Sequence, residues 1–284
     1  MAPSQTILAL DIGGTKMLAA MVRDAAVLET RRMPTPRSGD PRQWLGALFE
    51  AIGDWKGRYD AVGVAVTGIV DDGRWSPLNR RTLDIPDRFP LVATVAELAG
   101  TDRVLAANDA QAAAWGEYAF GAGQGHDMVF LTISTGIGGG IVVNGRLLGG
   151  LAGHFGQFRS LIEPDRTLED GVSGNWVATE AASHLKGATA RDVFAAAADG
   201  QSWAQAIVTA SARQTALLCS NIQLALDPAC IVIGGGIGLA PGYLESVRQM
   251  HEGQPPRLAP RVVAAALGET AGAVGIADLA KRQN

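Results

Sequence analysis

Two glycine-rich turns, each entered from an apolar run, constrain the fold of this chain most. The first reads Asp-Ile-Gly-Gly-Thr-Lys over residues 11–16, after an apolar run that starts at Ile7. The second reads Ser-Thr-Gly-Ile-Gly-Gly-Gly over residues 134–140, after another that starts at Met128. Glycine lets the backbone turn tightly and lets a ligand approach its N–H groups closely. Two such turns predict two half-sites that close on one polyphosphate.

The predicted elements repeat in order along the two halves of the chain. Each half opens with strands on either side of its glycine turn and continues with alternating helices and strands. This pattern predicts a duplicated α/β architecture with a ligand cleft between two domains. Strands are expected at 7–12, 17–22, 26–33, 61–66, 103–107, 127–133, 139–143, 229–233 and 261–266, and helices at 41–56, 91–99, 108–118, 173–185, 189–199, 202–226, 241–250 and from 271.

Charge and hydropathy patterning exclude several classes of function. The formal net charge is −4 and no dense stripe of Lys or Arg appears, so nucleic-acid and anionic-membrane binding are disfavoured. No apolar run reaches the roughly 18 residues that a membrane helix needs, and the N-terminus lacks a signal-peptide pattern. Cys219 and Cys230 fall in helix and strand patterns and are interpreted as buried thiols. We therefore expect a cytoplasmic protein.

The first glycine turn is neither a Walker P-loop nor a Rossmann fingerprint, because it joins two strands instead of opening a helix. Asp11 is a candidate Mg²⁺ ligand that acts through water, since Mg²⁺ keeps much of its hydration shell. Gly13, Gly14 and Thr15 could contact phosphate. The alternative, which the sequence leaves open, is a plain hairpin with a turn aspartate.

Asp109 lies between the two turns, directly after a strand and at the start of a helix. A carboxylate there can take the proton of an alcohol as that alcohol attacks phosphorus. It could equally be an acidic residue stabilised by the helix dipole. In the second turn, the Thr135 hydroxyl followed by Gly136 suits the β- and γ-phosphates. A flexible glycine hairpin is the alternative.

Four further residues have both a functional and a structural interpretation. His154 lies in a glycine-rich loop, where a lone histidine is more often an ordinary surface residue. Glu169 could simply supply first-turn acidity to the next helix. Gly235 and Gly236 follow an apolar strand, where the backbone could approach a flat ring such as adenine or could make a strand-to-helix turn.

Together these motifs resemble the ROK family of sugar kinases, over nearly the whole chain. Within that family the chain is most similar to bacterial N-acetylmannosamine kinases, which also carry histidine at position 154, where other members have glutamate. The resemblance implies an actin/hexokinase-like (ribonuclease H-like) duplicated two-domain α/β fold with a central cleft. The matching motifs are residues 11–16, 67–68, 79, 108–110, 134–140, 149–154, 169 and 234–236.

The resemblance also implies roles for individual residues. Asp109 would be the general base that activates the sugar 6-hydroxyl, and Asp11 would lie near Mg²⁺. The residues expected to hold the sugar are Gly68, Asn79, Asn108, Asp109, His154, Gln157 and Glu169. Those expected to hold ATP are Asp11, Gly13, Gly14, Thr15, Lys16, Thr135, Gly136, Gly235 and Gly236.

One departure from the family pattern concerns metal. ROK kinases usually carry a structural zinc site, formed by a Gly-His step and a Cys-x-Cys-Gly-x-x-Gly-Cys motif. Here Gln157 replaces the histidine, Thr167 stands where the last cysteine belongs, and the loop is shorter. A structural zinc needs four N or S ligands, which this segment lacks. We therefore predict no structural zinc, with Glu169 held in place without metal. Because the missing histidine also contacts sugar in the family, substrate preference is left open.

The implied activity is ATP-dependent phosphorylation of N-acetylmannosamine to its 6-phosphate, a step of sialic acid catabolism. A glucokinase, an N-acetylglucosamine kinase or a non-catalytic sugar-binding protein are the alternatives. A sugar-responsive repressor would carry an N-terminal helix-turn-helix, which we do not expect here because Asp11 follows the start of the sequence almost immediately. The resemblance suggests a homodimer. The expected domains are 1–108, joined by a C-terminal helix at about 271–284, and 109–270.

Overall fold

The computed structural model describes residues 5–80, 82–159 and 165–283. The chain divides into two compact units, of which the first comprises Met1–Phe120, Leu147–Ala152 and Glu269–Asn284. The second comprises Gly121–Arg146 and Gly153–Gly268. In this division residues 109–120 belong to the first unit, whereas the boundary expected from the sequence lies after residue 108, and that domain assignment stays a prediction. The intervening helix stays with the first unit because it packs along the C-terminal helix of that unit.

A five-stranded sheet forms the centre of the first unit, in the order β3-β2-β1-β4-β7. Its first three strands make an antiparallel meander, and β1, β4 and β7 are parallel. The parallel strands therefore end at one edge of the sheet. The strands are β1 (Thr6–Ile12), β2 (Lys16–Arg23), β3 (Ala26–Pro34), β4 (Ala61–Val66) and β7 (Val104–Asn108).

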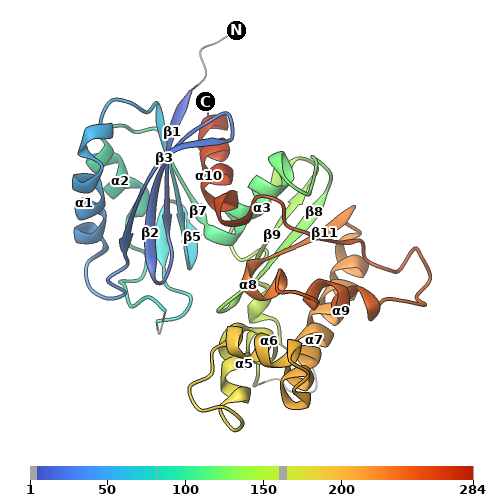
Figure 1. Ribbon diagram of the computed structural model, residues 1–284. Coiled ribbons are helices and arrows are strands. Elements are labelled where there is room, and N and C mark those ends of the chain that lie inside the picture. The colour runs from blue at the N-terminus through green and yellow to red at the C-terminus, as the bar shows by residue number, and fades with distance from the viewer. Residues whose placement is uncertain (1–4, 81, 160–164, 284) are drawn as a thin grey trace. The chain divides into compact units, whose positions relative to one another are not determined.

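Alternation along β1 sends its side chains to two different cores. Leu8 and Leu10 belong to a cluster with large side chains from α1 (Pro41–Ala51) and α2 (Leu91–Ala99). Ile7 and Ala9 belong to a second cluster, rich in alanine, with α10 (Ala271–Arg282). Figure 1 shows α1 and α2 on one face of this sheet and α10 on the other.

The alanine-rich face lets helices approach very closely. A Cβ atom added at Gly275 of α10 would lie 1.8 Å from the carbonyl oxygen of Ala112, on α3 (Asp109–Phe120). One added at Gly63 of β4 would lie 2.5 Å from the carbonyl oxygen of Ile276. Glycine is therefore required at both contacts, which fix α10 against α3 and the sheet.

The sheet of the second unit has the corresponding order, β10-β9-β8-β11-β12. As in the first unit, a hairpin pairs the first two strands and two later strands add in parallel. The predicted duplication is therefore present in the strand order. The strands are β8 (Met128–Ile133), β9 (Ile137–Val143), β10 (Arg146–Leu147), β11 (Cys230–Gly234) and β12 (Val262–Ala264).

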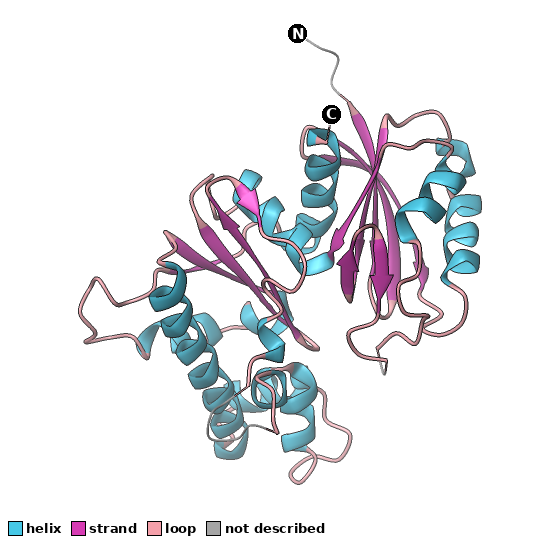
Figure 2. Cartoon of the chain, turned by 180° about the vertical axis from the view of Figure 1, so that it is seen from behind, coloured by secondary structure: helices cyan, strands magenta, loops and turns pink. Residues whose placement is uncertain are grey.

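The helices of the second unit pack mainly on one another and around the long helix α7, whose predicted bounds of 202–226 are confirmed (Figure 2). This helix ends in the left-handed residue Asp227, before Pro228. Cys219 and Cys230 are free, buried thiols, as predicted. The helices are α4 (Glu169–Val172), α5 (Gly174–Ala181), α6 (Ala190–Ala198), α7 (Ser202–Leu226), α8 (Gly235–Gly238) and α9 (Tyr243–Gln249).

Short elements complete the chain, and some predicted elements are shorter than expected. The helix predicted for 41–56 ends at Ala51, because Gly53 begins a separate 3-10 turn. The helix predicted for 173–185 ends at Ala181. No helix among the described residues combines the length and apolarity needed to span a bilayer. The short elements are η1 (Gly53–Trp55), β5 (Ile69–Asp71), β6 (Arg74–Ser76), η2 (Phe155–Gln157) and η3 (Gly268–Thr270).

Candidate functional site

In both units the predicted site residues follow the carboxyl ends of parallel strands. In the first unit the first glycine turn follows β1, Gly68 follows β4 and Asp109 follows β7. In the second unit Thr135 follows β8 and Gly235 follows β11. Ligands of α/β sheets bind at this edge. Each unit therefore carries one group of candidate residues.

The first glycine turn is supported from outside by two side chains. The Thr35 hydroxyl donates to the carbonyl oxygen of Gly13 at 2.8 Å, and Nε of Arg37 donates to that of Gly14 at 3.0 Å. A Cβ atom added at Gly14 would lie 2.6 Å from the Thr82 methyl carbon. The backbone of Thr15 is held as well, since its carbonyl accepts from Thr35 N at 3.1 Å. Neither supporting residue was predicted, because contacts to carbonyls leave no sequence motif.

The carboxyl group of Asp11 has a raised pKa, because its surroundings disfavour the charged form. Its withdrawal from water, and then the charge of Asp109, raise the pKa of Asp11 to about 7, against a smaller lowering by Lys16. Two carboxylates that repel one another favour a cation between or beside them. The arrangement therefore fits Mg²⁺, which would be held by Asp11 through water.

Lys16, predicted to contact ATP, forms an ion pair with Glu269 in this structure. Its Nζ lies 3.5 Å from the carboxylate oxygen, and both side chains are mostly exposed. Exposed pairs of this kind contribute little to stability. A phosphate group could therefore replace Glu269 as the partner of Lys16.

Asn108 and Asp109 begin α3, so the predicted helix cap is present. The Asn108 side-chain oxygen accepts from Ala110 N at 3.0 Å and Gln111 N at 3.2 Å, and its Nδ2 donates to the carbonyl oxygen of Gly68 at 2.9 Å. Asp109 Oδ1 accepts from Ala110 N at 2.8 Å. These bonds orient Asp109 at the end of β7. The structural and catalytic interpretations are compatible.

The segment after β4 is built around Gly68, whose φ is +111°. A Cβ atom there would lie 2.5 Å from the carbonyl oxygen of Ser76, so only glycine fits. Trp75 Nε1 donates to the carbonyl oxygen of Thr67 at 2.8 Å and fixes the turn. Asn79 is exposed, and its carbonyl accepts from two later backbone N–H groups. Its predicted role in sugar binding stays a prediction.

Gln111 is a site residue that the sequence prediction missed. This buried side chain donates to the carbonyl oxygen of Gly150 at 3.0 Å and of Ala152 at 2.8 Å. Both belong to the glycine-rich loop that leads to His154. Gln111 lies in the stretch that carries the family resemblance, but nothing in its spacing predicted this role.

The second glycine turn is joined directly to Glu169. Oε2 of Glu169 accepts from Ile137 N at 2.9 Å, and a Cβ atom at Gly136 would lie 2.6 Å from the same oxygen. The carbonyl oxygens of Ser134 and Thr135 accept from the first N–H groups of α5, at 2.7 and 3.2 Å. The predicted phosphate-binding turn and the predicted sugar-binding glutamate therefore form one assembly.

His154 is the least satisfied polar side chain of this group. Both of its ring nitrogens are buried, and neither has a hydrogen-bond partner among the described residues. The preceding Gly153, at φ +90°, packs against the backbone of Gly139, which leaves no room for a Cβ atom. Gln157, at the position where the family resemblance implies a histidine, is exposed on η2.

Gly235 and Gly236 make a strand-to-helix turn after β11, which was one of the two interpretations of these glycines. At Gly235 φ is +85°, and a Cβ atom would lie 2.3 Å from the carbonyl oxygen of Ile133. The position of a Cβ atom at Gly236 is open within 4 Å. This leaves space for a close ligand beside Gly236, so the nucleotide-binding role stays a prediction.

Ring packing and hydrogen bonds connect the described parts of the loop 155–168. The Phe155 and Phe158 rings pack edge to face with 5.3 Å between centroids, and Leu168 N donates to the carbonyl oxygen of Phe158 at 2.8 Å. Asp170 Oδ2 accepts from both N and Oγ1 of Thr167, which lowers the pKa of Asp170. Residues 160–164 of this loop lie outside the described part of the chain. Among described residues no group of three or more potential metal-binding side chains occurs.

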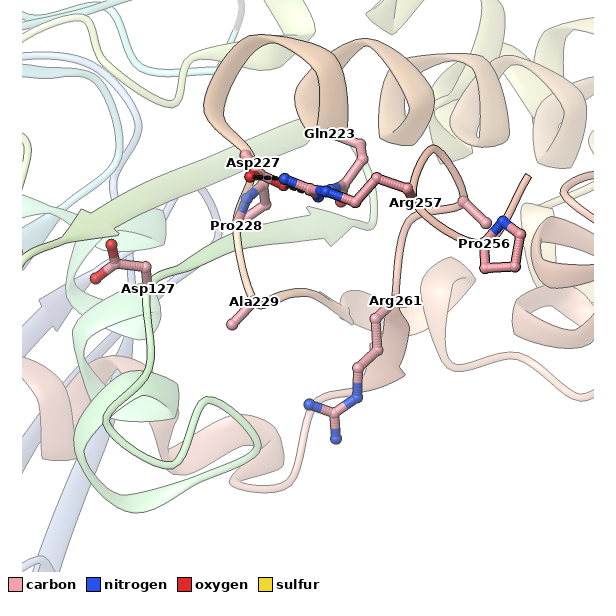
Figure 3. A pocket seen from close by; sticks show the side chains of 9 residues that line it. Asp127, Gln223, Asp227, Pro228, Ala229, Pro256, Arg257 and Arg261 are labelled. Carbon is pink, nitrogen blue, oxygen red and sulfur yellow. Dashed lines mark hydrogen bonds and ion pairs between the residues drawn. The ribbon is translucent and has the colours of Figure 1, made fainter. Parts of the chain in front are cut away.

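A separate pocket of about 470 Å³ lies at the opposite edge of the second sheet, where β8, β11 and β12 begin. Figure 3 shows Arg257 reaching Asp227, while Arg261 points away from that pair. None of the predicted site residues lines this pocket. It is therefore not the candidate active site.

Comparison with known proteins assigns the family. The model of the ROK family matches residues 7–283. A bifunctional enzyme NanE/NanK of Brucella melitensis is 47% identical over 98% of this chain, which covers 54% of that protein. An N-acetylmannosamine kinase of Shigella flexneri is 40% identical, with 97% of this chain and 98% of that protein covered.

A solved structure supports the same assignment. A ROK family glucokinase of Streptomyces griseus, in complex with glucose and AMPPNP, is 30% identical. Its TM-score is 0.81, with 98% of this chain and 99% of that chain covered. The expected actin/hexokinase-like α/β fold class is thereby confirmed. The chain spans about half the length of the Brucella relative.

Proposed function

This chain belongs to the ROK family, and from that premise we propose that it transfers the γ-phosphoryl group of ATP to the 6-hydroxyl of N-acetylmannosamine. The Shigella flexneri relative, which is 40% identical and is named an N-acetylmannosamine kinase, favours that sugar over glucose. The observation that carries the proposal is the buried imidazole of His154, unpartnered within the described structure. A neutral imidazole offers one donor and one acceptor, which matches a sugar hydroxyl.

In the proposed reaction Asp109 takes the proton of the 6-hydroxyl. The sugar oxygen forms a bond to the γ-phosphorus as the bond from that phosphorus to ADP breaks. The bonds made by Asn108 and Ala110 would hold the carboxylate in place for this transfer. Phosphoryl transfer depends mainly on the positioning of the two substrates and on stabilisation of the charge on the phosphates. Few protein groups therefore need to take part in covalent steps.

ATP and Mg²⁺ are the proposed cofactor and metal. Gly13, Gly14 and Thr15 in the first unit, and Thr135 and Gly136 in the second, would bind phosphate through backbone N–H groups and hydroxyls. Mg²⁺, held near Asp11, would neutralise charge on the phosphates. Gly235 and Gly236 would line the nucleotide site. No structural zinc is proposed, and the cytoplasm as the site of action stays a prediction.

The remaining sugar contacts are proposed for Gly68, Asn79, Asn108, Gln157 and Glu169. Glu169 already bonds Ile137 N through one oxygen, so its other oxygen would face the sugar. The Gln157 side chain would donate and accept hydrogen bonds at a position where the family resemblance implies a histidine. This substitution is the feature most able to change the preferred sugar.

A homodimer is proposed from the family and from one exposed surface. Leu217 and Leu224 of α7 are 57% and 69% exposed and lie two helical turns apart, on one side of the helix. A second copy would bury them. Light scattering after size-exclusion chromatography should report a dimer that Leu224→Glu converts to monomer, whereas Leu185→Glu, at an exposed position outside α7, should not.

The test of the function is ADP release with N-acetylmannosamine, N-acetylglucosamine, glucose and mannose. N-acetylmannosamine should give the highest kcat/KM, and chelation of Mg²⁺ should abolish the signal. Higher kcat/KM with glucose would instead assign a glucokinase, as in the Streptomyces relative. Sugar binding without ADP release would assign a non-catalytic sugar-binding protein.

A further inference from the structure

A line of buried hydroxyl groups runs through the helical part of the second unit. Tyr243, the first residue of α9, is fully buried, and its Oη lies 2.8 Å from both Ser211 Oγ and Thr215 Oγ1. Ser211 and Thr215 lie one turn apart on α7 and are themselves buried. Ser211 Oγ also lies 2.9 Å from the carbonyl oxygen of Val172.

The proton positions along this line follow from counting donors. A carbonyl oxygen only accepts, so the single proton of Ser211 goes to Val172. Ser211 must then accept from Tyr243, and Tyr243 in turn accepts from Thr215. Burial raises the pKa of Tyr243 to about 12, which keeps the phenol in its donor form. The result is a directed chain, from Thr215 through Tyr243 and Ser211 to the Val172 carbonyl.

Val172 lies within a short segment, 169–174, that is tied to the second glycine turn at both ends. At one end Glu169 Oε2 accepts from Ile137 N at 2.9 Å. At the other end Gly174 N donates to the carbonyl oxygen of Ser134 at 2.7 Å. The hydroxyl chain therefore holds the middle of the segment whose ends hold the turn.

We propose that Tyr243, Ser211 and Thr215 are positioning residues, which fix the 169–174 segment and through it the 134–137 turn from the helical core. They contact neither substrate in this proposal. The effect of these three residues on catalysis rests on the proposed kinase function. Their effect on the position of the 134–137 turn does not depend on that function.

The first test is kinetic. Tyr243→Phe keeps the ring and removes the hydroxyl, so the turn should bind nucleotide less well while Asp109 is untouched. We expect the KM for ATP to rise about three- to tenfold, the range that follows from loss of a buried hydrogen bond, with a smaller change in kcat. Tyr59→Phe is the matched control, because the Tyr59 hydroxyl lies in the first unit, where it donates to the Ala99 carbonyl oxygen at 3.4 Å. It should leave both constants unchanged.

The second test needs no enzymatic activity. Backbone amide hydrogen exchange should become faster over 134–137 and 169–175 in Tyr243→Phe, and stay unchanged in Tyr59→Phe. If exchange accelerates but no sugar is phosphorylated by the unmodified protein, the positioning stands and the kinase proposal fails. Unchanged exchange in these segments and an unchanged KM, with only a lower melting temperature, would overturn the positioning proposal.

A graded series tests the direction of the chain and covers the case in which Tyr243→Phe does not fold. Ser211→Ala removes the group that contacts Val172 and should have the largest effect on exchange, followed by Tyr243→Phe and then Thr215→Val. Thr215→Ser retains the hydroxyl and should restore the behaviour of the unmodified protein. Equal effects of Thr215→Val and Thr215→Ser would contradict the proposed chain.

Discussion

The carboxylate of Glu169 accepts a hydrogen bond from the backbone N–H of Ile137, with 2.9 Å between Oε2 and N. A residue predicted to bind sugar is thus also a support of the turn predicted to bind phosphate. The bond is possible because Gly136, next to it, has no side chain. Changes at this contact should affect both substrates at once.

Glu169→Ala should raise the KM for both sugar and ATP, since it removes the sugar contact and leaves Ile137 N without an acceptor. We expect about a tenfold rise or more for each, from the loss of a charge-assisted hydrogen bond. Glu169→Gln retains an oxygen acceptor and should affect ATP less than Glu169→Ala does. Initial-rate kinetics with each substrate varied will measure this. A rise confined to the sugar KM would show that the contact to Ile137 does not support the turn.

Asp109→Asn should lower kcat while sugar binding persists. A general base of this kind accounts for about 10²- to 10⁴-fold in rate. Asparagine retains the side-chain oxygen that accepts from Ala110 N, so the start of α3 should stay intact. Steady-state kinetics and calorimetric titration of the sugar measure the two effects separately. Near-normal turnover would exclude Asp109 as the base.

Asp11 should make the free protein less stable as pH rises. Burial raises the pKa of Asp11 in the folded state to about 7, from an ordinary value of 3.8, so between these values the folded state holds a proton that the unfolded state has lost. The free energy of unfolding should then fall by up to about 1.4 kcal/mol per pH unit between pH 4 and 7, and the contribution of this group should level off above 7.

The measurement is urea unfolding from pH 5 to 8 with chelator present. Asp11→Asn has no carboxylate to bury, so it should lose this dependence and should be more stable than the unmodified protein at pH 8. Asp72→Asn, at an exposed turn, is the control and should follow the unmodified protein. If the unmodified protein, Asp11→Asn and Asp72→Asn all showed the same dependence of unfolding free energy on pH, the pKa of Asp11 would not be raised in the folded state.

Hydrophobic periodicity predicted most of the elements, because buried faces leave a regular pattern in the sequence. The 202–226 helix and the 61–66 strand are examples, and the glycine turns were located by the same alternation. Two sets of hydrogen bonds were not predicted. Thr35 donates to the carbonyl oxygen of Gly13, and Gln111 donates to the carbonyl oxygens of Gly150 and Ala152 in a distant loop. Such contacts join residues far apart in sequence, and a single hydroxyl or amide has no spacing that indicates its partner.

The packing of α3 against α10 was not predicted, for a related reason. The glycines that bring these two helices together become meaningful only once both helices are placed. The roles of individual site residues came from family resemblance. The structure added which of these residues are fixed by hydrogen bonds and which residues supply those bonds. It also showed which buried polar atoms have no hydrogen-bond partner among the described residues.

Gly275→Ala should destabilise the first unit strongly. The new methyl group would lie 1.8 Å from the Ala112 carbonyl oxygen, a backbone atom that cannot move without shifting α3. We expect a loss of at least about 3 kcal/mol, at the upper end for overpacked cores. Gly46→Ala, in α1 with no atom within 4 Å of the added carbon, should instead stabilise by up to about 1 kcal/mol. Urea unfolding distinguishes the two, and equal effects would refute the close contact.

The shortened loop should work without zinc. Thr167, at the position where the family resemblance implies a cysteine, donates twice to Asp170, at 2.9 and 2.8 Å, directly beside Glu169. The purified protein should therefore contain no stoichiometric zinc, and chelation followed by return of Mg²⁺ alone should restore full activity. Asp170→Ala should lower the free energy of unfolding by about 1 kcal/mol, because the two hydrogen bonds from Thr167 are lost. It should also raise the sugar KM, because those bonds fix the backbone beside Glu169. Stoichiometric zinc by metal analysis, or activity that only zinc restores, would show that a metal and not Asp170 holds this loop.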